Sequence, residues 1–201
     1  MRQFKDMHII GIDHGYGNLK TVSGIFPASV LPFDHEPIHA QDLLVYGGKY
    51  YVIGSGHREF TPDKVSNSDH YILTLAGIGQ ELWAHRMTHA RVYIAAGLPL
   101  TWVESQRERF RAYLLQNSHV DFTWRGIAYH VEIVGASVYA QGFSAIVPML
   151  RQFKGVNMLC DIGNGTMNIM TIQDRRAVMD QCFTEKYGTC LLYTSPSPRD
   201  A

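Results

Sequence analysis

The chain has 201 residues, of which 46% are hydrophobic and 18% are charged, and its formal net charge is zero. This composition is typical of a globular protein with a sizeable core and excludes a disordered chain. The balanced charge gives no indication of bulk attraction to nucleic acid or to an anionic membrane. No apolar run reaches the length of a membrane span, and the N-terminus lacks the apolar segment of a secretory signal.

The cysteines favour a cytoplasmic location. They are Cys160, Cys182 and Cys190, an odd number with no Cys-x-x-Cys spacing, as expected for unpaired thiols in a reducing compartment. Cys160 lies inside an apolar run, so we interpret it as a core residue rather than a nucleophile.

The first half of the chain predicts strands followed by a helix. Gly47-Gly48 sits between two apolar runs and predicts a hairpin with a two-residue turn. Apolar residues recur at helical spacing after Ser68 or Asp69, either of which can cap a helix. The predicted elements are a strand at 7–13, two antiparallel strands within 18–31, a loop at 32–39, the hairpin at 42–53, a loop at 54–67 and a helix at 69–87 with an apolar stripe that includes Leu75, Leu82 and Trp83.

The second half predicts two further helices and a second group of strands. Val103, Phe110 and Leu114 should form the inner face of the first of these helices, which starts with a capping box from Thr101 to Glu104. The predicted elements are a strand at 91–99, a helix at 102–117, a hairpin at 120–134 that turns at Arg125-Gly126, a helix at 137–152 and strands at 156–161, 166–173 and 176–183.

Two similar segments stand out within this order. In each, an apolar strand ends on an aspartate and enters a Gly-x-Gly turn: Ile9 to Lys20 contains Asp13-His14-Gly15-Tyr16-Gly17-Asn18, and Met158 to Asn168 contains Asp161-Ile162-Gly163-Asn164-Gly165-Thr166. Glycine lets backbone N–H groups approach an anion, and one or two carboxylates suit Mg²⁺ with its bound waters. A single such turn is more often an ordinary hairpin, but the pair is a stronger signal.

These segments resemble the two phosphate motifs of the actin–Hsp70–sugar-kinase superfamily. The segment from Val134 to Gly142 resembles its first connecting helix. Within the superfamily, the sequence is most similar to the ParM/StbA-type actin-like ATPases of plasmid segregation, and the resemblance covers nearly all of residues 7–190. The resemblance implies an α/β fold of RNase H-like lobes, with a mixed sheet and flanking helices. It also implies binding of ATP or GTP with Mg²⁺, assembly into filaments, and an indirect link to DNA through an adaptor protein, without a membrane partner.

The resemblance also assigns roles to residues. Asp13 and Asp161 would hold Mg²⁺ and its waters, and Gln141 would orient the attacking water. A neutral amide is a poor base, so slow hydrolysis is expected. The groups that would meet the nucleotide phosphates are Gly15, Tyr16, Gly17, Asn18, Lys20, Gly163, Asn164, Gly165 and Thr166.

The chain departs from the family pattern in two ways. The second motif usually continues Gly-Thr-Thr-Asp, whereas here it reads Gly165-Thr166-Met167-Asn168. The adenosine motif and the second connecting helix are absent, so we expect a truncated protein with weak or no nucleotide binding and no activity of its own. The expected division is a first lobe at 1–154 with a small hairpin insertion around 38–67, the opening strands of a second lobe at 155–190, and a Ser-Pro tail at 191–201 that is interpreted as non-native.

Two other functions stay open at this point. A small-molecule kinase of the same superfamily would need a carboxylate base, and the connecting region offers Gln141 instead. The other alternative is a non-enzymatic phage or plasmid scaffold protein. The presence of Asp13, Lys20, Asp161 and both glycine turns argues against it.

The histidines and one charged run carry weaker signals. Glu81, His85 and His89 share a predicted helical face, for which a solvated face is favoured over a metal site. His14 either contacts the nucleotide or points to solvent. The charged run 107–111 predicts the solvent-exposed face of an amphipathic helix.

Overall fold

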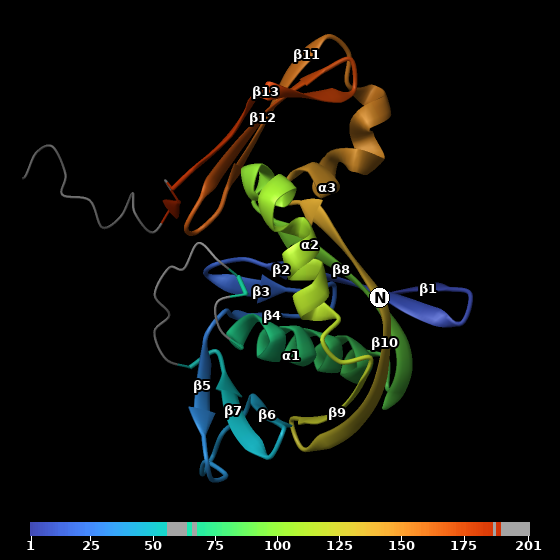
Figure 1. The fold of residues 1–201 in the computed structure, drawn as a ribbon, viewed down its shortest axis with the longest axis vertical. Coiled ribbons are helices and arrows are strands. Elements are labelled where there is room, and N and C mark those ends of the chain that lie inside the picture. Colours follow the sequence, from blue (N-terminus) through green and yellow to red (C-terminus); the bar gives the residue numbers. More distant parts are fainter. Residues whose placement is uncertain (56–63, 66–67, 187, 190–201) are drawn as a thin grey trace, which may run out of the picture. The chain divides into compact units, whose positions relative to one another are not determined.

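The computed structural model describes residues 1–55, 64–65, 68–186 and 188–189 (Figure 1). These residues form two compact units, the first comprising 1–96 and 108–138 and the second comprising 97–107 and 139 onward. The expected division into lobes at residue 154 stays a prediction. The loop predicted at 54–67 lies largely outside the described residues, as does the tail at 191–201.

The first unit is built on a large mixed sheet. Its strands are β1 (Arg2–Phe4), β2 (Met7–His14), β3 (Asn18–Lys20), β4 (Ile25–Pro27), β5 (Val30–Phe33), β6 (Leu43–Tyr46), β7 (Lys49–Ile53), β8 (His89–Leu98), β9 (His119–Trp124) and β10 (Ile127–Ala140). They lie in the order β4-β3-β2-β8-β10-β9-β6-β7-β5, with β1 beside β2. Strand β2 runs parallel to β8, whereas β2–β3, β6–β7 and β9–β10 are antiparallel.

Most of these strands confirm the sequence predictions. The hairpin at Gly47-Gly48 forms as expected, with both glycines at positive φ. The loop predicted at 32–39 is wrong at its start, because Val30–Phe33 pairs with β7 in the sheet.

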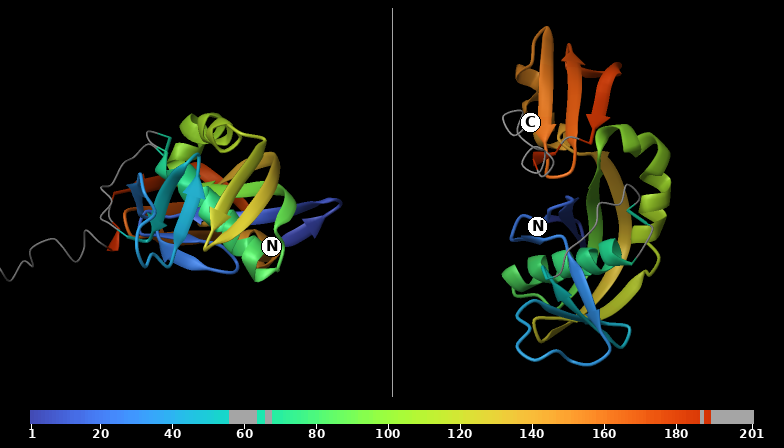
Figure 2. Two further views of the ribbon diagram at one scale, coloured as in Figure 1. Left: turned by 90° about the horizontal axis from the view of Figure 1, so that it is seen from below. Right: turned by 90° about the vertical axis from the view of Figure 1, so that its left-hand side faces the viewer.

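Helix α1 (Asp69–Ala84) crosses the strands of this sheet (Figure 2). The predicted single apolar stripe is too narrow, since every residue from His70 to Leu82 is buried. The strands β5 and β7 also contact the helix, and Phe110 and Tyr113 of α2 (Val103–Leu114) lie against its first turn. Trp83, predicted to face inward, is 47% exposed and lies under the Arg125 guanidinium.

The start of α1 is held by a group that the sequence did not reveal. Ser68 is the N-cap residue, but its side chain makes no capping hydrogen bond. The backbone N–H of Tyr71 instead donates to the Tyr113 hydroxyl at 2.9 Å. The inner face of α2 is confirmed, because Val103, Phe110 and Leu114 are all buried.

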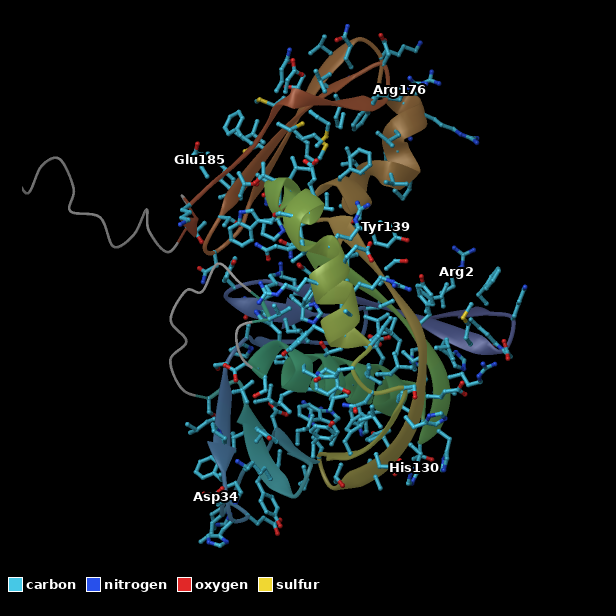
Figure 3. All side chains as sticks on the ribbon, viewed as in Figure 1. Arg2, Asp34, His130, Tyr139, Arg176 and Glu185 are labelled. Carbon is cyan, nitrogen blue, oxygen red and sulfur yellow. The ribbon has the colours of Figure 1, made fainter. Side chains whose placement is uncertain are left out.

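The second unit contains a three-stranded antiparallel sheet of β11 (Val156–Ile162), β12 (Met167–Gln173) and β13 (Arg176–Glu185). Figure 3 labels both ends of β13. The predicted helix at 137–152 is wrong in its first part. Strand β10 continues to Ala140, followed by the short helix α3 (Phe143–Ile146) and the 3-10 helix η2 (Val147–Gln152). Val134, Val138 and Tyr139 are residues that favour strands over helices.

One face of this small sheet is packed and the other is open. Met170 and Ile172 form a buried cluster with Ile146 and with Leu100 of η1 (Leu100–Trp102). On the opposite face, the described residues leave Val156, Met158, Cys160, Ile162 and Phe183 exposed. The interpretation of Cys160 as a core residue is therefore wrong for the described structure, because alternate residues of β11 face outward.

A buried ion pair joins the N-terminus to α1. The Met1 ammonium contacts Glu81 Oε2 at 2.8 Å, and the Ser23 N–H donates to Glu81 Oε1 at 2.7 Å. Burial raises the pKa of the Glu81 carboxyl, but hydrogen bonds from the Met1 ammonium, the Thr21 side chain and the Ser23 N–H outweigh it. The pKa therefore lies below its ordinary value of 4.5.

We expect Glu81→Gln to lower the free energy of unfolding by about 2–3 kcal/mol, because it leaves the buried ammonium without its counter-charge. A lowered folded pKa stabilises the protein above pH 4.5, and this contribution is lost as the pH falls through the folded value. Urea unfolding between pH 3 and 7 should show that loss in the wild type and not in the variant. The exposed Glu104→Gln serves as control, and equal midpoints for Glu81→Gln and wild type would contradict the expectation.

Candidate phosphate-binding turns

The first glycine turn connects β2 to β3. Asp13 lies opposite Lys20 across the two strands, and the Lys20 Nζ is 3.6 Å from Asp13 Oδ2. Both side chains remain about half exposed, at 43% for Asp13 and 53% for Lys20. The carboxylate and the ammonium are therefore accessible to a metal ion and to an anion.

The turn itself is tight. A Cβ on Gly15 would lie 2.6 Å from the carbonyl oxygen of Asn18, so a larger residue would displace the backbone there. Gly15, Tyr16 and Gly17 are partly exposed and Asn18 is exposed. This accessible backbone fits the predicted approach of phosphate oxygens.

His14 does neither of the two things expected of it. Its side chain is fully buried, and its Nε2 lies 2.8 Å from the Thr74 hydroxyl on α1. That hydroxyl donates its proton to the His70 carbonyl at 2.6 Å, so His14 must donate from Nε2. His14 therefore links the first glycine turn to α1 through a buried hydrogen bond.

The second glycine turn connects β11 to β12. Asp161 lies opposite Asn168 across the two strands, and the turn closes through a hydrogen bond from the Gly163 N–H to the Thr166 carbonyl at 2.8 Å. Asn164 is exposed and Gly163 and Gly165 are partly exposed, whereas the Thr166 side chain is buried. The side chain of Thr166, predicted to meet a phosphate, is thus the least accessible part of this turn.

Gln141 and Asp161 come from distant parts of the sequence and lie close together. The Gln141 N–H donates to the Leu98 carbonyl at 2.8 Å, which fixes it at the end of β8. The next residue, Gly142, has φ +75°, and a Cβ there would lie 3.0 Å from the Asp161 Cβ and 3.2 Å from Oδ2. The structure therefore brings the residue that follows Gln141 beside the predicted magnesium ligand, while the Gln141 side chain lies close to Gly97.

Asn168 is a site residue whose role the sequence did not reveal. Its Nδ2 donates to Asp161 Oδ2 at 3.3 Å, while its Oδ1 accepts from the Thr184 hydroxyl at 2.8 Å and from the Leu100 N–H at 3.3 Å. The amide orientation is fixed, because the carboxylate can only accept and the backbone N–H can only donate. An aspartate at this position would instead place two carboxylates side by side.

The two turns share one arrangement. In each, the aspartate pairs across the hairpin with the residue seven positions later, Lys20 in the first unit and Asn168 in the second. The two turns differ in the charge of the residue opposite the aspartate: Lys20 is a cation, whereas Asn168 is a neutral hydrogen-bond donor. Asp13 and Asp161 belong to different units, so a shared Mg²⁺ stays a prediction.

The family described as "Actin like proteins N terminal domain" matches residues 11–143, which include the first turn and Gln141. The chain belongs to this actin-like family. Comparison with curated proteins gives no match.

Solved structures show the same actin-like fold. The apo ParM protein of pSK41 has a TM-score of 0.74 at 17% identity, covering 94% of this chain and 69% of that one. The archaeal actin homologue Ta0583 in complex with ADP has a TM-score of 0.72 at 20% identity, covering 92% and 62%. An AlfA filament bound to AMPPNP has a TM-score of 0.64 at 13% identity, covering 91% and 71%. The chain thus spans about two thirds of the length of these actin-like structures.

The histidines do not form a metal site within the described residues. No group of three or more His, Cys, Asp or Glu side chains there could hold an ion. Glu81, His85 and His89 each make a different interaction. The Glu81 carboxylate forms an ion pair with the Met1 ammonium, and His85 Nδ1 donates to the Glu81 carbonyl at 2.8 Å. The His89 ring stacks on the His130 ring with their centroids 4.7 Å apart. The run 107–111 is exposed except for Phe110, as predicted. Among the described helices none is long and apolar enough to cross a membrane.

We expect Asn168→Leu to destabilise the second unit by about 2 kcal/mol, because a buried backbone N–H and the Asp161 carboxylate both lose their amide partner. Thermal unfolding of the variant should show a lower midpoint. Asn157→Leu is the matched control. Its amide bonds only to exposed carbonyls, and it should change stability by less than about 0.5 kcal/mol. Equal midpoints for Asn168→Leu and wild type would remove the assigned role.

Proposed function

We propose that this chain is the nucleotide-binding part of an actin-like ATPase that assembles into filaments for plasmid segregation. The observation that carries the proposal is the repeated turn, in which Asp13 and Asp161 each end a strand and face a polar residue seven positions later. Membership of the actin-like family supports it, as do structural neighbours that include an ADP complex of Ta0583, an AlfA filament bound to AMPPNP and a Bacillus thuringiensis ParM with AMPPNP.

The residues of both turns fit a magnesium nucleotide. Asp13 and Asp161 would bind Mg²⁺ directly or through its waters, and the glycine turns would offer N–H groups to the phosphates. When bound, Mg²⁺ neutralises charge on the transferring phosphoryl group. Lys20 would add a cation at the first turn, and Asn168 holds the Asp161 carboxylate in place by its 3.3 Å hydrogen bond.

Gln141 would orient the water that attacks the γ-phosphate. Its backbone is fixed by its bond to Leu98, and it precedes Gly142, where an added Cβ would lie 3.0 Å from the Asp161 Cβ. Phosphoryl transfer depends on positioning and charge stabilisation more than on a strong base, so an amide suffices for slow hydrolysis. A slow reaction would set the lifetime of a filament.

Titration of the full-length protein with ATP, in the presence and absence of Mg²⁺, tests the proposal. Light scattering and phosphate release then follow its assembly and its hydrolysis of ATP. We expect magnesium-dependent binding, and a rise in scattering that decays as phosphate is released. Phosphate transfer to a sugar in a coupled assay would favour the small-molecule kinase instead. No nucleotide binding at millimolar ATP would favour the scaffold protein and contradict the proposal.

A further inference from the structure

The hairpin of the first glycine turn has one residue pair that faces α1 and a neighbouring pair that faces outward. His14 lies opposite Leu19 across β2 and β3, and both side chains are fully buried. Asp13 lies opposite Lys20, and both of these side chains are about half exposed. Because successive side chains of a strand point to opposite faces, whatever fixes the inward pair also fixes the direction of the outward pair.

A threonine of α1 holds His14 through two buried hydrogen bonds in series. The Thr74 hydroxyl accepts from His14 Nε2 at 2.8 Å and donates to the His70 carbonyl, one helical turn earlier, at 2.6 Å. Thr74 and His14 are fully buried, and His70 is 1% exposed. A hydroxyl has a single proton, so its bond to the carbonyl makes His14 the donor of the other bond. The two bonds together fix the orientation of the His14 ring against the helix.

The other member of the inward pair approaches the same helix at a glycine. A Cβ on Gly77 would lie 3.2 Å from Leu19 Cδ2, closer than ordinary packing allows. Glycine is unfavourable in the interior of a helix, and here it permits the close approach of the hairpin. Further along α1, Gln80 Nε2 donates to the Ser23 carbonyl at 3.1 Å. The helix therefore holds the hairpin at several points between His14 and Ser23.

We infer that Thr74 is a positioning residue of the first glycine turn, which directs Asp13 toward a bound magnesium ion by holding His14. The inference rests on the proposed function and deepens it, because it names the contact that sets the direction of one proposed magnesium ligand. Thr74 is fully buried, so it acts through the hairpin and not by contact with the metal or the phosphates. A ligand group held in its binding direction loses less freedom on binding, which increases affinity.

Thr74→Val in the full-length protein tests the inference, because valine is close to threonine in shape but cannot accept the hydrogen bond from His14. Calorimetric titration with ATP, with and without Mg²⁺, measures the affinities. We expect a loss of about tenfold with Mg²⁺ and of less than about threefold without it, since Asp13 acts on the metal. Thr74→Ser keeps the hydroxyl and should bind within about threefold of wild type.

Ile78→Val is the matched control for stability. Ile78 is another fully buried residue of α1, and its truncation removes packing without removing a hydrogen bond. We expect a lower unfolding midpoint for this variant and wild-type affinity for ATP with Mg²⁺.

The outcomes separate the inference from the function on which it rests. A full-length wild type that binds no ATP contradicts the proposed function. If the wild type binds and Thr74→Val binds equally well with Mg²⁺, the inference alone is overturned. It is also overturned if Thr74→Val loses affinity equally with and without Mg²⁺, if Thr74→Ser or Ile78→Val shows the same loss, or if circular dichroism shows Thr74→Val to be unfolded. Each of these results would assign Thr74 to the stability of the fold and not to the direction of Asp13.

Discussion

In a full-length version of the protein, replacing Asp161 by asparagine should lower the affinity for magnesium ATP by about a hundredfold, equivalent to about 2.7 kcal/mol. The carboxylate would be the second unit's ligand for Mg²⁺, and a neutral amide binds this hard cation poorly. The fold should survive, because an asparagine at 161 can still accept the hydrogen bond from Asn168 Nδ2. Calorimetric titration with ATP, with and without Mg²⁺, measures the effect.

The matched control is Asp174→Asn. Asp174 lies between β12 and β13 with φ +47°, a conformation that asparagine also adopts, and β12 separates it from the glycine turn. We expect wild-type affinity for the control and a lost response to Mg²⁺ for Asp161→Asn. Equal magnesium dependence in the two variants would show that Asp161 is not a ligand.

In a full-length version of the protein, replacing Gln141 by alanine should slow ATP hydrolysis by roughly a hundredfold while leaving nucleotide binding and filament assembly intact. The reason is that Gln141 would act on the attacking water and not on the nucleotide in its ground state. Its backbone bond to Leu98 does not depend on the side chain, so the end of β8 should keep its structure. Phosphate release and light scattering, followed in the same sample, separate the two effects.

Gln152→Ala, an exposed residue of η2 in the same unit, is the control and should hydrolyse ATP as wild type does. We expect filaments of Gln141→Ala to form and to persist longer, because hydrolysis would set their lifetime. Normal turnover in this variant would refute the role given to Gln141.

Much of the fold could be predicted because its signals are local. The Gly47-Gly48 turn and the alternation in β12 identify a hairpin and a strand without knowledge of the rest of the chain. The two glycine turns were found in the same way, from an aspartate and two glycines at fixed spacing. In the structure both turns join antiparallel strands with the same pairing, Asp13 with Lys20 and Asp161 with Asn168.

The errors arise where tertiary contacts override local preference. The helix predicted from residue 137 begins only at Phe143, because the preceding residues extend β10 beside its neighbours. Trp83 fits the apolar stripe by spacing, yet it lies at the end of α1, where the described strands no longer cover it. The periodicity of apolar residues predicts which face of a helix is buried, but not how much of the helix its neighbours cover.

The roles of two site residues could not be predicted from sequence at all. His14 was expected at the nucleotide or in solvent, and its burial depends on Thr74, sixty positions away. Asn168 was noted only as a missing carboxylate. In each case the function of the side chain follows from a hydrogen bond between distant segments, which spacing along the chain does not encode.

Paramagnetic relaxation with Mn²⁺ in place of Mg²⁺ tests the central claim most directly. In the isotope-labelled full-length protein with ATP, Mn²⁺ broadens the amide signals of residues close to the metal. If both turns bind one metal nucleotide, the signals of 15–20 and of 163–166 should broaden together at the same low Mn²⁺ concentration, and only when ATP is present. Broadening of one turn alone, or of neither, would contradict the account.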